Sequence, residues 1–403
     1  MQKPMLKNTD TLHQVDSADD VSLFRGGLFY RVQLLTRLVG PERWNVGRRV
    51  VIVLAITWLP LVIITGLSNR EQLISLLTDY EVYSRVVIAI PVLLIGQLVM
   101  EDRFGIVARH VRQAGLLEGD ALQKMKDVLA TIRRLRDSPF SELVIVTLIF
   151  VELTLVWNTR VATGPVWAVS RSGGVAHLTP AGWYYGLVCA PIYQLFLGLC
   201  FWKWLLWSYF LFRLSRMDLN LVATHPDSHG GLGFLGLSPV AFTPLAFALS
   251  VVIGASWSRE IANNAARLRS FQLPAIILVV LMFIMALSPL VLFVRKLDAL
   301  RRTAMLQYGV LAQRYTKYLQ GKWFSPAGPP EEAQFSATEV TVLADFALSY
   351  RNIKRMRPFP ADKGTLIGLA LAVTVPLLPA VLAEFPFSVI VRGLLQAVKA
   401  VPM

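Results

Sequence analysis

The stretch VIVLAITWLPLVIITGL, residues 51–67, runs for seventeen residues without a charged side chain. A helix needs about 20 predominantly apolar residues to cross the hydrocarbon core of a bilayer. With its flanks this stretch, roughly residues 49–67, is long enough. Six further stretches have similar character, at residues 84–101, 141–158, 183–212, 234–256, 274–295 and 365–384. The sequence therefore predicts an all-α fold, a polytopic membrane helix bundle with about seven transmembrane helices and helical cytoplasmic extensions.

The composition of the chain agrees with a membrane location. The 403 residues are 55% hydrophobic and only 16% charged, with a mean hydropathy of +0.53, which is more apolar than a soluble domain. The net charge of +14 would also suit nucleic acid. However, the basic residues lie at the ends of apolar stretches, where anionic lipid headgroups attract them. We therefore expect membrane lipids as partners at the cytoplasmic face and no nucleic acid.

The distribution of basic residues predicts the orientation. Thirty of the forty Lys and Arg residues fall in four segments, and only nine fall in the loops on the opposite side. The four segments are residues 1–49, 101–139, 213–233 and 295–363. Basic residues beside apolar spans stay on the cytoplasmic side. The pattern predicts a multi-pass protein of the inner (plasma) membrane with a cytoplasmic N-terminus.

The same pattern divides the chain into four parts. Residues 1–48 form a cytoplasmic segment with an amphipathic surface helix at 21–39. Residues 49–295 hold the first six transmembrane helices, with a cytoplasmic helical loop at 101–139. Residues 296–363 form a cytoplasmic helical region, and residues 364–403 hold the seventh helix and an apolar tail. The tail, at residues 385–400, has the composition of an interfacial helix.

Helical periodicity continues outside the apolar stretches. Residues 103–136 predict two amphipathic helices broken near Gly115–Gly119. The sixth stretch keeps its periodicity to about Gly321. Ser336 and Glu339 form a capping-box pattern before a helix at 337–356. The extended fourth and sixth helices and this last helix suggest one helical layer beneath the membrane.

Residues 161–181 carry the only plausible β-structure in the sequence. Their pattern predicts a small hairpin outside the membrane, with Ser172, Gly173 and Gly174 at the turn. Six of the seven stretches also contain proline, including Pro91 and Pro191. Each proline frees a backbone carbonyl and can kink its helix.

Three polar side chains fall inside apolar stretches at similar depths. Glu152 lies about 16 Å from the cytoplasmic end of the third stretch, where an ionised carboxylate is costly. Gln194 comes at a similar depth and Gln97 lies nearer the cytoplasm, so the three predict one polar cluster. Its role is either part of a transport path or an interhelical hydrogen bond that fixes packing. Lys203 lies near the interface, where its ammonium group is expected to extend to the headgroups.

The linker after the fourth stretch contains the unusual segment His225-Pro-Asp-Ser-His-Gly-Gly-Leu-Gly-Phe-Leu-Gly236. His225, Asp227 and His229 are all possible ligands of a divalent metal of unknown identity. Gly230 and Gly231 could instead leave N–H groups free to bind an anion such as a lipid headgroup. The third interpretation is a tight turn, in which Asp227 caps the backbone and the glycines turn the chain.

The sequence contains no P-loop, dinucleotide fingerprint, HExxH or GxSxG motif. We therefore expect no cofactor and no catalytic residues. The favoured function is transport, by an oligomeric ion channel or small-solute transporter that assembles as a homo-oligomer. One alternative is a scaffold or sensor that recruits cytoplasmic partners. Another is a metal-dependent membrane enzyme that uses the segment at His225 on a lipid or phosphorylated substrate.

Overall fold

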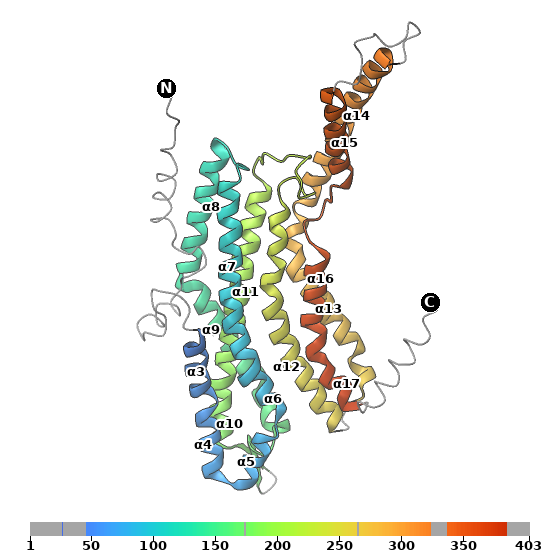
Figure 1. Cartoon of the computed structure of the whole chain (residues 1–403). Coiled ribbons are helices and arrows are strands. Elements are labelled where there is room, and N and C mark those ends of the chain that lie inside the picture. The colour runs from blue at the N-terminus through green and yellow to red at the C-terminus, as the bar shows by residue number, and fades with distance from the viewer. Residues whose placement is uncertain (1–25, 27–45, 173–174, 264–265, 324–336, 385–403) are drawn as a thin grey trace, which may run out of the picture.

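A computed structural model describes residue 26 and residues 46–172, 175–263, 266–323 and 337–384 of the chain. Seven helical segments in this part are long and apolar enough to cross a membrane (Figure 1). They are Val46–Ser68, Tyr80–Gln113, Pro139–Thr159, Pro180–Ser215, Gly233–Ala262, Leu268–Val291 and Lys363–Glu384. The fold is thus an all-α bundle, and the predicted number of spans is confirmed.

Most spans are built from more than one helix. The first span comprises α3 (Val46–Thr57) and α4 (Leu59–Ser68), and the second comprises α6 (Tyr80–Val82), η1 (Tyr83–Ala89) and α7 (Ile90–Gln113). The third span lies within α9 (Pro139–Thr163), and the fourth comprises α10 (Pro180–Tyr184), η2 (Tyr185–Cys189) and α11 (Ala190–Ser215). The fifth span comprises η3 (Gly233–Leu237), η4 (Pro239–Phe242) and α12 (Thr243–Ala262), and the sixth comprises η5 (Leu268–Phe271) and α13 (Gln272–Val291). The seventh comprises α16 (Lys363–Thr374), η6 (Val375–Leu377) and α17 (Leu378–Glu384).

The two ends of the bundle differ (Figure 1). One end, here the hairpin end, carries α5 (Arg70–Leu77) and the antiparallel strands β1 (Val169–Ser172) and β2 (Val175–Leu178). The strands confirm the predicted hairpin, although Gly173 and Gly174 lie outside the described residues. The other end, here the extension end, carries α8 (Asp120–Asp137), α14 (Val294–Trp323) and α15 (Ala337–Arg355).

The extension end has two parts. Helix α7 ends at Gln113, and the chain then turns through Gly115 and Gly119, both with positive φ, into α8, as the periodicity predicted. Helix α8 buries Met125, Val128, Leu129 and Ile132 in the main core and packs on α11.

Helices α14 and α15 pair with each other instead, with Tyr308 and Phe346 stacked 5.8 Å apart, and project from the bundle as an arm (Figure 1). The single layer suggested by the sequence is therefore divided. Helix 337–356 is confirmed as α15. The expected helix at 21–39, Ser336 of the capping box, and the tail at 385–400 lie outside the described residues.

The spans pack closely where glycine faces a backbone or a proline. A Cβ atom added to Gly254 of α12 would lie 2.5 Å from the carbonyl oxygen of Pro376 in the last span. One added to Gly96 of α7 would lie 2.9 Å from the Cβ atom of Pro244. Helix α12 thus touches the second and seventh spans and lies centrally in the bundle.

A second, smaller core holds the hairpin in place. It joins apolar side chains of α4, α5 and η1 to Trp167, which is 1% exposed, and to its neighbours in β1 and α10. The Thr179 hydroxyl donates to the Trp167 carbonyl at 2.7 Å. This core fixes the hairpin against the ends of the second and fourth spans, where the candidate site lies.

Candidate functional site

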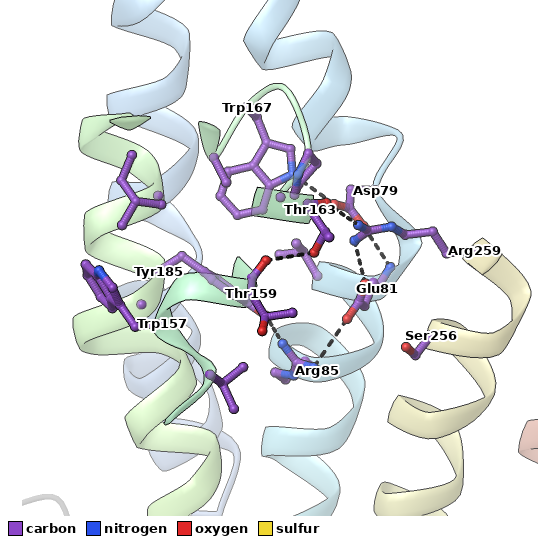
Figure 2. A pocket seen from close by; sticks show the side chains of 18 of the residues that line it. Asp79, Glu81, Arg85, Trp157, Thr159, Thr163, Trp167, Tyr185, Ser256 and Arg259 are labelled. Atoms are coloured by element: carbon purple, nitrogen blue, oxygen red, sulfur yellow. Dashed lines mark hydrogen bonds and ion pairs between the residues drawn. The ribbon is translucent and has the colours of Figure 1, made fainter. Parts of the chain in front are cut away.

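A cavity of about 660 Å³ opens at the hairpin end of the bundle (Figure 2). It is enclosed by the second, third, fourth and fifth spans and by the hairpin. Its charged lining residues are Asp79, Glu81, Arg85, Glu152, Arg259 and Glu260, and its aromatic ones are Trp157, Trp167 and Tyr185. Charged side chains inside membrane segments are costly and mark functional regions. This cavity is the candidate functional site.

Two π-helical turns shape the wall of the cavity, and proline explains both. The Ile90 N–H donates to the Arg85 carbonyl and the Ala190 N–H to the Tyr185 carbonyl, each five residues earlier. Pro91 and Pro191 follow directly. A proline ring clashes with the carbonyl four residues before it in an α-helix, and a wider turn relieves that clash. Such π turns occur often at functional sites.

The two π turns face each other across the cavity wall. The Arg85 guanidinium in η1 donates to the Tyr185 hydroxyl in η2. The same guanidinium carbon lies 5.8 Å from the Tyr185 ring centroid and 5.9 Å from that of Tyr193. Aromatic faces attract cations at such distances. Arg85 is therefore held by hydrogen bonding and by two aromatic rings.

Glu81 lies between two arginines (Figure 2). Its Oε2 accepts from Nη1 of Arg259 at 2.6 Å, and its Oε1 accepts from Nη2 of Arg85 at 3.4 Å. Arg259 also donates to the Thr163 carbonyl at 3.3 Å. The Glu81 and Arg85 side chains are 18% exposed and that of Arg259 is 30% exposed. This network ties together the second, third and fifth spans.

Asp79 anchors the hairpin beside this network. One carboxylate oxygen accepts from the Trp167 indole N–H at 2.8 Å, and the other accepts from the Glu81 N–H at 3.0 Å. Asp79 thus caps the helix that carries Glu81 and fixes Trp167 above the cavity.

The structure brings together two of the three predicted polar residues. The Gln194 amide on α11 donates to the Glu152 carboxylate on α9. Gln97 lies elsewhere, on α7, where its backbone carbonyl accepts from the Lys203 ammonium group of α11 at 3.4 Å. Glu152 lines the cavity, while neither glutamine is among the lining residues.

The expectation that Lys203 extends to the headgroups is wrong. Its Nζ atom pairs with Oε1 of Glu101 at 2.5 Å, and the two side chains are only 12% and 10% exposed. A buried lysine requires a counterion, and Glu101 lies at the right position on the neighbouring parallel helix. Glu101 ends the second apolar stretch, and the local sequence gives no signal for a partner 102 positions away.

The segment from His225 to Gly236 forms a turn around Asp227. The Asp227 carboxylate accepts from the N–H groups of His229, Gly231 and Gly233 at 2.8–3.2 Å. Burial raises the pKa of Asp227, but these N–H groups and His225 outweigh that effect and hold the pKa below its usual value. Of the two N–H groups predicted to be free for an external anion, that of Gly231 therefore binds a carboxylate of the chain itself.

The same turn is joined to the segment between α15 and α16. The His229 ring Nδ1 lies 3.0 Å from the Arg357 carbonyl, and the Arg357 N–H donates to the Ser228 carbonyl at 2.8 Å. Ser228, Gly230 and Gly231 have positive φ. Within the described ranges no three His, Cys, Asp or Glu side chains are arranged to hold a metal ion, those at His225 included.

The central residues of the cavity have little signal in the sequence. Arg85 and Arg259 are two of the nine basic residues on the side opposite the four basic segments, and that pattern indicates no partner for either of them. One signal was present: Glu81 and Arg85 are four residues apart beside an apolar stretch, which allows an ion pair on one helix face. The pairing with Arg259, 178 residues away, has no local signal.

No protein family, curated protein or solved structure matches this chain. The fold and the cavity therefore define the class alone: a multi-pass membrane protein with a charged cavity at one end of its helix bundle.

Proposed function

We propose that this protein is a membrane carrier for a small solute that bears a positive charge. The observation that carries the proposal is the cavity of about 660 Å³, which opens at the hairpin end and reaches Glu152 on the third span. Glu152 lies 13 residues from the start of α9, or about 20 Å, and 11 residues, about 17 Å, from its end. A solute at Glu152 would be near the middle of the membrane.

The charges of the lining favour a cation. Four carboxylates and two guanidinium groups line the cavity, which gives a formal charge of −2. Both arginines contact Glu81, and Arg85 also contacts two tyrosine rings. The aromatic lining residue Trp157 adds a ring face that attracts cations.

Gln194 prepares Glu152 for this role. Its amide donates to one carboxylate oxygen from the adjacent helix and so orients the group. Glu152 is only half-buried and belongs to the cavity lining, so an entering solute can reach it.

A carrier fits this geometry better than an open channel. Toward the extension end the bundle interior is filled by fully buried side chains, including Phe104, Trp207 and Phe210. A site open on one side and closed on the other is the arrangement of a carrier in one of its states. The distribution of basic residues supports a plasma-membrane location with the extension end in the cytoplasm and near anionic lipids. Homo-oligomeric assembly belongs to the same proposal.

The scaffold alternative has one supporting observation. The arm of α14 and α15 exposes apolar side chains, among them Leu306 at 74% and Tyr318 at 58%. Exposed apolar side chains on an extramembrane arm suit contact with a partner.

The test of the carrier proposal is cation binding by purified protein in lipid nanodiscs. Methylammonium and tetramethylammonium chlorides are titrated against thermal unfolding, with sodium chloride as the ionic control. Each cation that stabilises the protein is then tested for uptake into proteoliposomes. We expect Glu152→Gln to weaken binding about 10- to 100-fold, because a hydrogen bond to a charged group contributes about 1.5–3 kcal/mol.

Glu142→Gln is the matched control, because it makes the same change on the same helix outside the cavity lining. Unchanged binding in Glu152→Gln, or stabilisation by anions in place of cations, would contradict the proposal.

A further inference from the structure

We propose that Glu101, Lys203 and Gln97 form the barrier that closes the route between the cavity and the extension end. The inference rests on the proposed carrier function and assigns residues to its closed side. These residues lie on α7 and α11, and the π-helical turns η1 and η2 that precede these two helices carry Arg85 and Tyr185 in the cavity wall.

The barrier lies beyond the cavity, toward the extension end. Glu101 follows Arg85 by 16 residues, which is about 24 Å along the second span. Lys203 follows Gln194 by nine residues, or about 14 Å along the fourth span. A solute that leaves Glu152 for the extension end along these helices passes the buried side chains of Leu93 and Phe196 and then meets the ion pair.

The contacts close the space between the two helices. The Lys203 ammonium group binds Oε1 of Glu101 at 2.5 Å and faces the Gln97 carbonyl at 3.4 Å. One turn nearer the extension end, the rings of Phe104 and Trp207 stack with centroids 4.2 Å apart, and both side chains are 0% exposed. An ion pair and an aromatic stack thus follow each other on the same pair of helices.

The ion pair is suited to opening. A buried pair recovers little net stability, because the attraction is offset by the hydration that both charges lose. The Gln97 side-chain nitrogen is buried without a hydrogen-bond partner in the described ranges, so it gains one when water enters. Separating the helices here would hydrate all three groups, which keeps the closed and open states close in free energy.

Cys200 is a natural reporter of this barrier. It lies one turn from Lys203 on α11, is 0% exposed, and its thiol faces the Leu93 carbonyl at 3.7 Å. Cys189 is the only other cysteine in the sequence. In a Cys189→Ser background, Cys200 is therefore the single thiol, and a membrane-impermeant cationic methanethiosulfonate measures access to it from each side of a proteoliposome.

We expect slow labelling of Cys200 in the background protein from both sides. Lys203→Met removes the ammonium group that binds Oε1 of Glu101, so we expect labelling from the extension end to rise at least tenfold. Exchanging the pair, Lys203→Glu with Glu101→Lys, is the matched control and should return labelling close to the background rate. Glu101→Gln, which keeps the shape of the side chain, gives the same comparison if Lys203→Met does not purify as a monodisperse protein.

Two results would overturn the barrier: labelling in both single variants that equals the background rate, or faster labelling from the hairpin end alone. The assay uses no transported solute, so its outcome is independent of the cation-binding test. Loss of binding in Glu152→Gln with unchanged Cys200 access would reject the barrier and leave the carrier proposal intact.

Discussion

Replacing Glu81 by glutamine tests whether the ion network holds the cavity wall together. The substitution keeps the size of the side chain and one acceptor oxygen but removes the charge between Arg85 and Arg259. Two guanidinium groups, 18% and 30% exposed, would then share no carboxylate at this position. We expect the second, third and fifth spans to be less tightly held at the hairpin end.

The size of the loss follows from the contacts. The bond between Glu81 and Arg259 is short, at 2.6 Å, and a hydrogen bond to a charged group contributes about 1.5–3 kcal/mol. The contact with Arg85 is longer, at 3.4 Å, and contributes about 0.5–1 kcal/mol. Partial exposure screens both, so we expect Glu81→Gln to lower the free energy of unfolding by about 2–3 kcal/mol.

A double-mutant cycle measures this directly. Unfolding free energies are compared for Glu81→Gln, Arg259→Gln and the double variant in one detergent, with Glu71→Gln, an exposed glutamate at the same end, as control. We expect a coupling energy of at least about 1 kcal/mol and a control effect within about 0.5 kcal/mol. Losses that simply add, within about 0.5 kcal/mol, would refute the reasoning.

Two further predictions concern the turn at Asp227 and the packing of α12. Asp227→Ala leaves three backbone N–H groups without their acceptor and should cost about 3 kcal/mol. The folded-state pKa of Asp227 is lowered, so its stabilising contribution is present above about pH 3.9 and is lost as the pH falls through the lowered pKa. The denaturation curves of the wild type and Asp227→Asn should therefore converge in acid. Gly254→Ala forces a methyl group to 2.5 Å from the Pro376 carbonyl and should cost about 1–3 kcal/mol in thermal unfolding, whereas Gly364→Ala, with open space around it, should not destabilise the protein.

The spans could be predicted from the sequence because hydrophobic length is a local property. Residues 51–67 need no knowledge of the rest of the chain to be assigned to a membrane helix. The same holds for the break at Gly115 and Gly119, the hairpin at 161–181 and helix 337–356, which rest on short-range periodicity and turn residues.

The site could be predicted only in part, because it depends on which helices become neighbours. Depth along a helix placed Glu152 and Gln194 at one level, and the two residues do meet. Depth does not give the direction in which a side chain points, so Gln97 was predicted to join the same cluster, although it is not among the residues that line the cavity and its backbone carbonyl, not its side chain, contacts Lys203. The pairs of Lys203 with Glu101 and of Glu81 with Arg259 join residues 102 and 178 positions apart.

Proline also had a more specific effect than a kink. Pro91 and Pro191 each end a π-helical turn, and the extra residue in that turn changes which side chains face the cavity. A helix projected at 3.6 residues per turn does not show this change in the direction of the side chains.

The central claim, that a water-accessible cavity reaches into the membrane from the hairpin end, is tested most directly by thiol labelling at Val156. Val156 lines the cavity one turn from Glu152, whereas Val151 on the same helix is 44% exposed and is not part of the lining. In a background without Cys189 and Cys200, a charged impermeant thiol reagent should modify Val156→Cys from the hairpin end and leave Val151→Cys, which faces lipid, unmodified. Equal labelling of both positions, or labelling of Val156→Cys only from the extension end, would contradict the account.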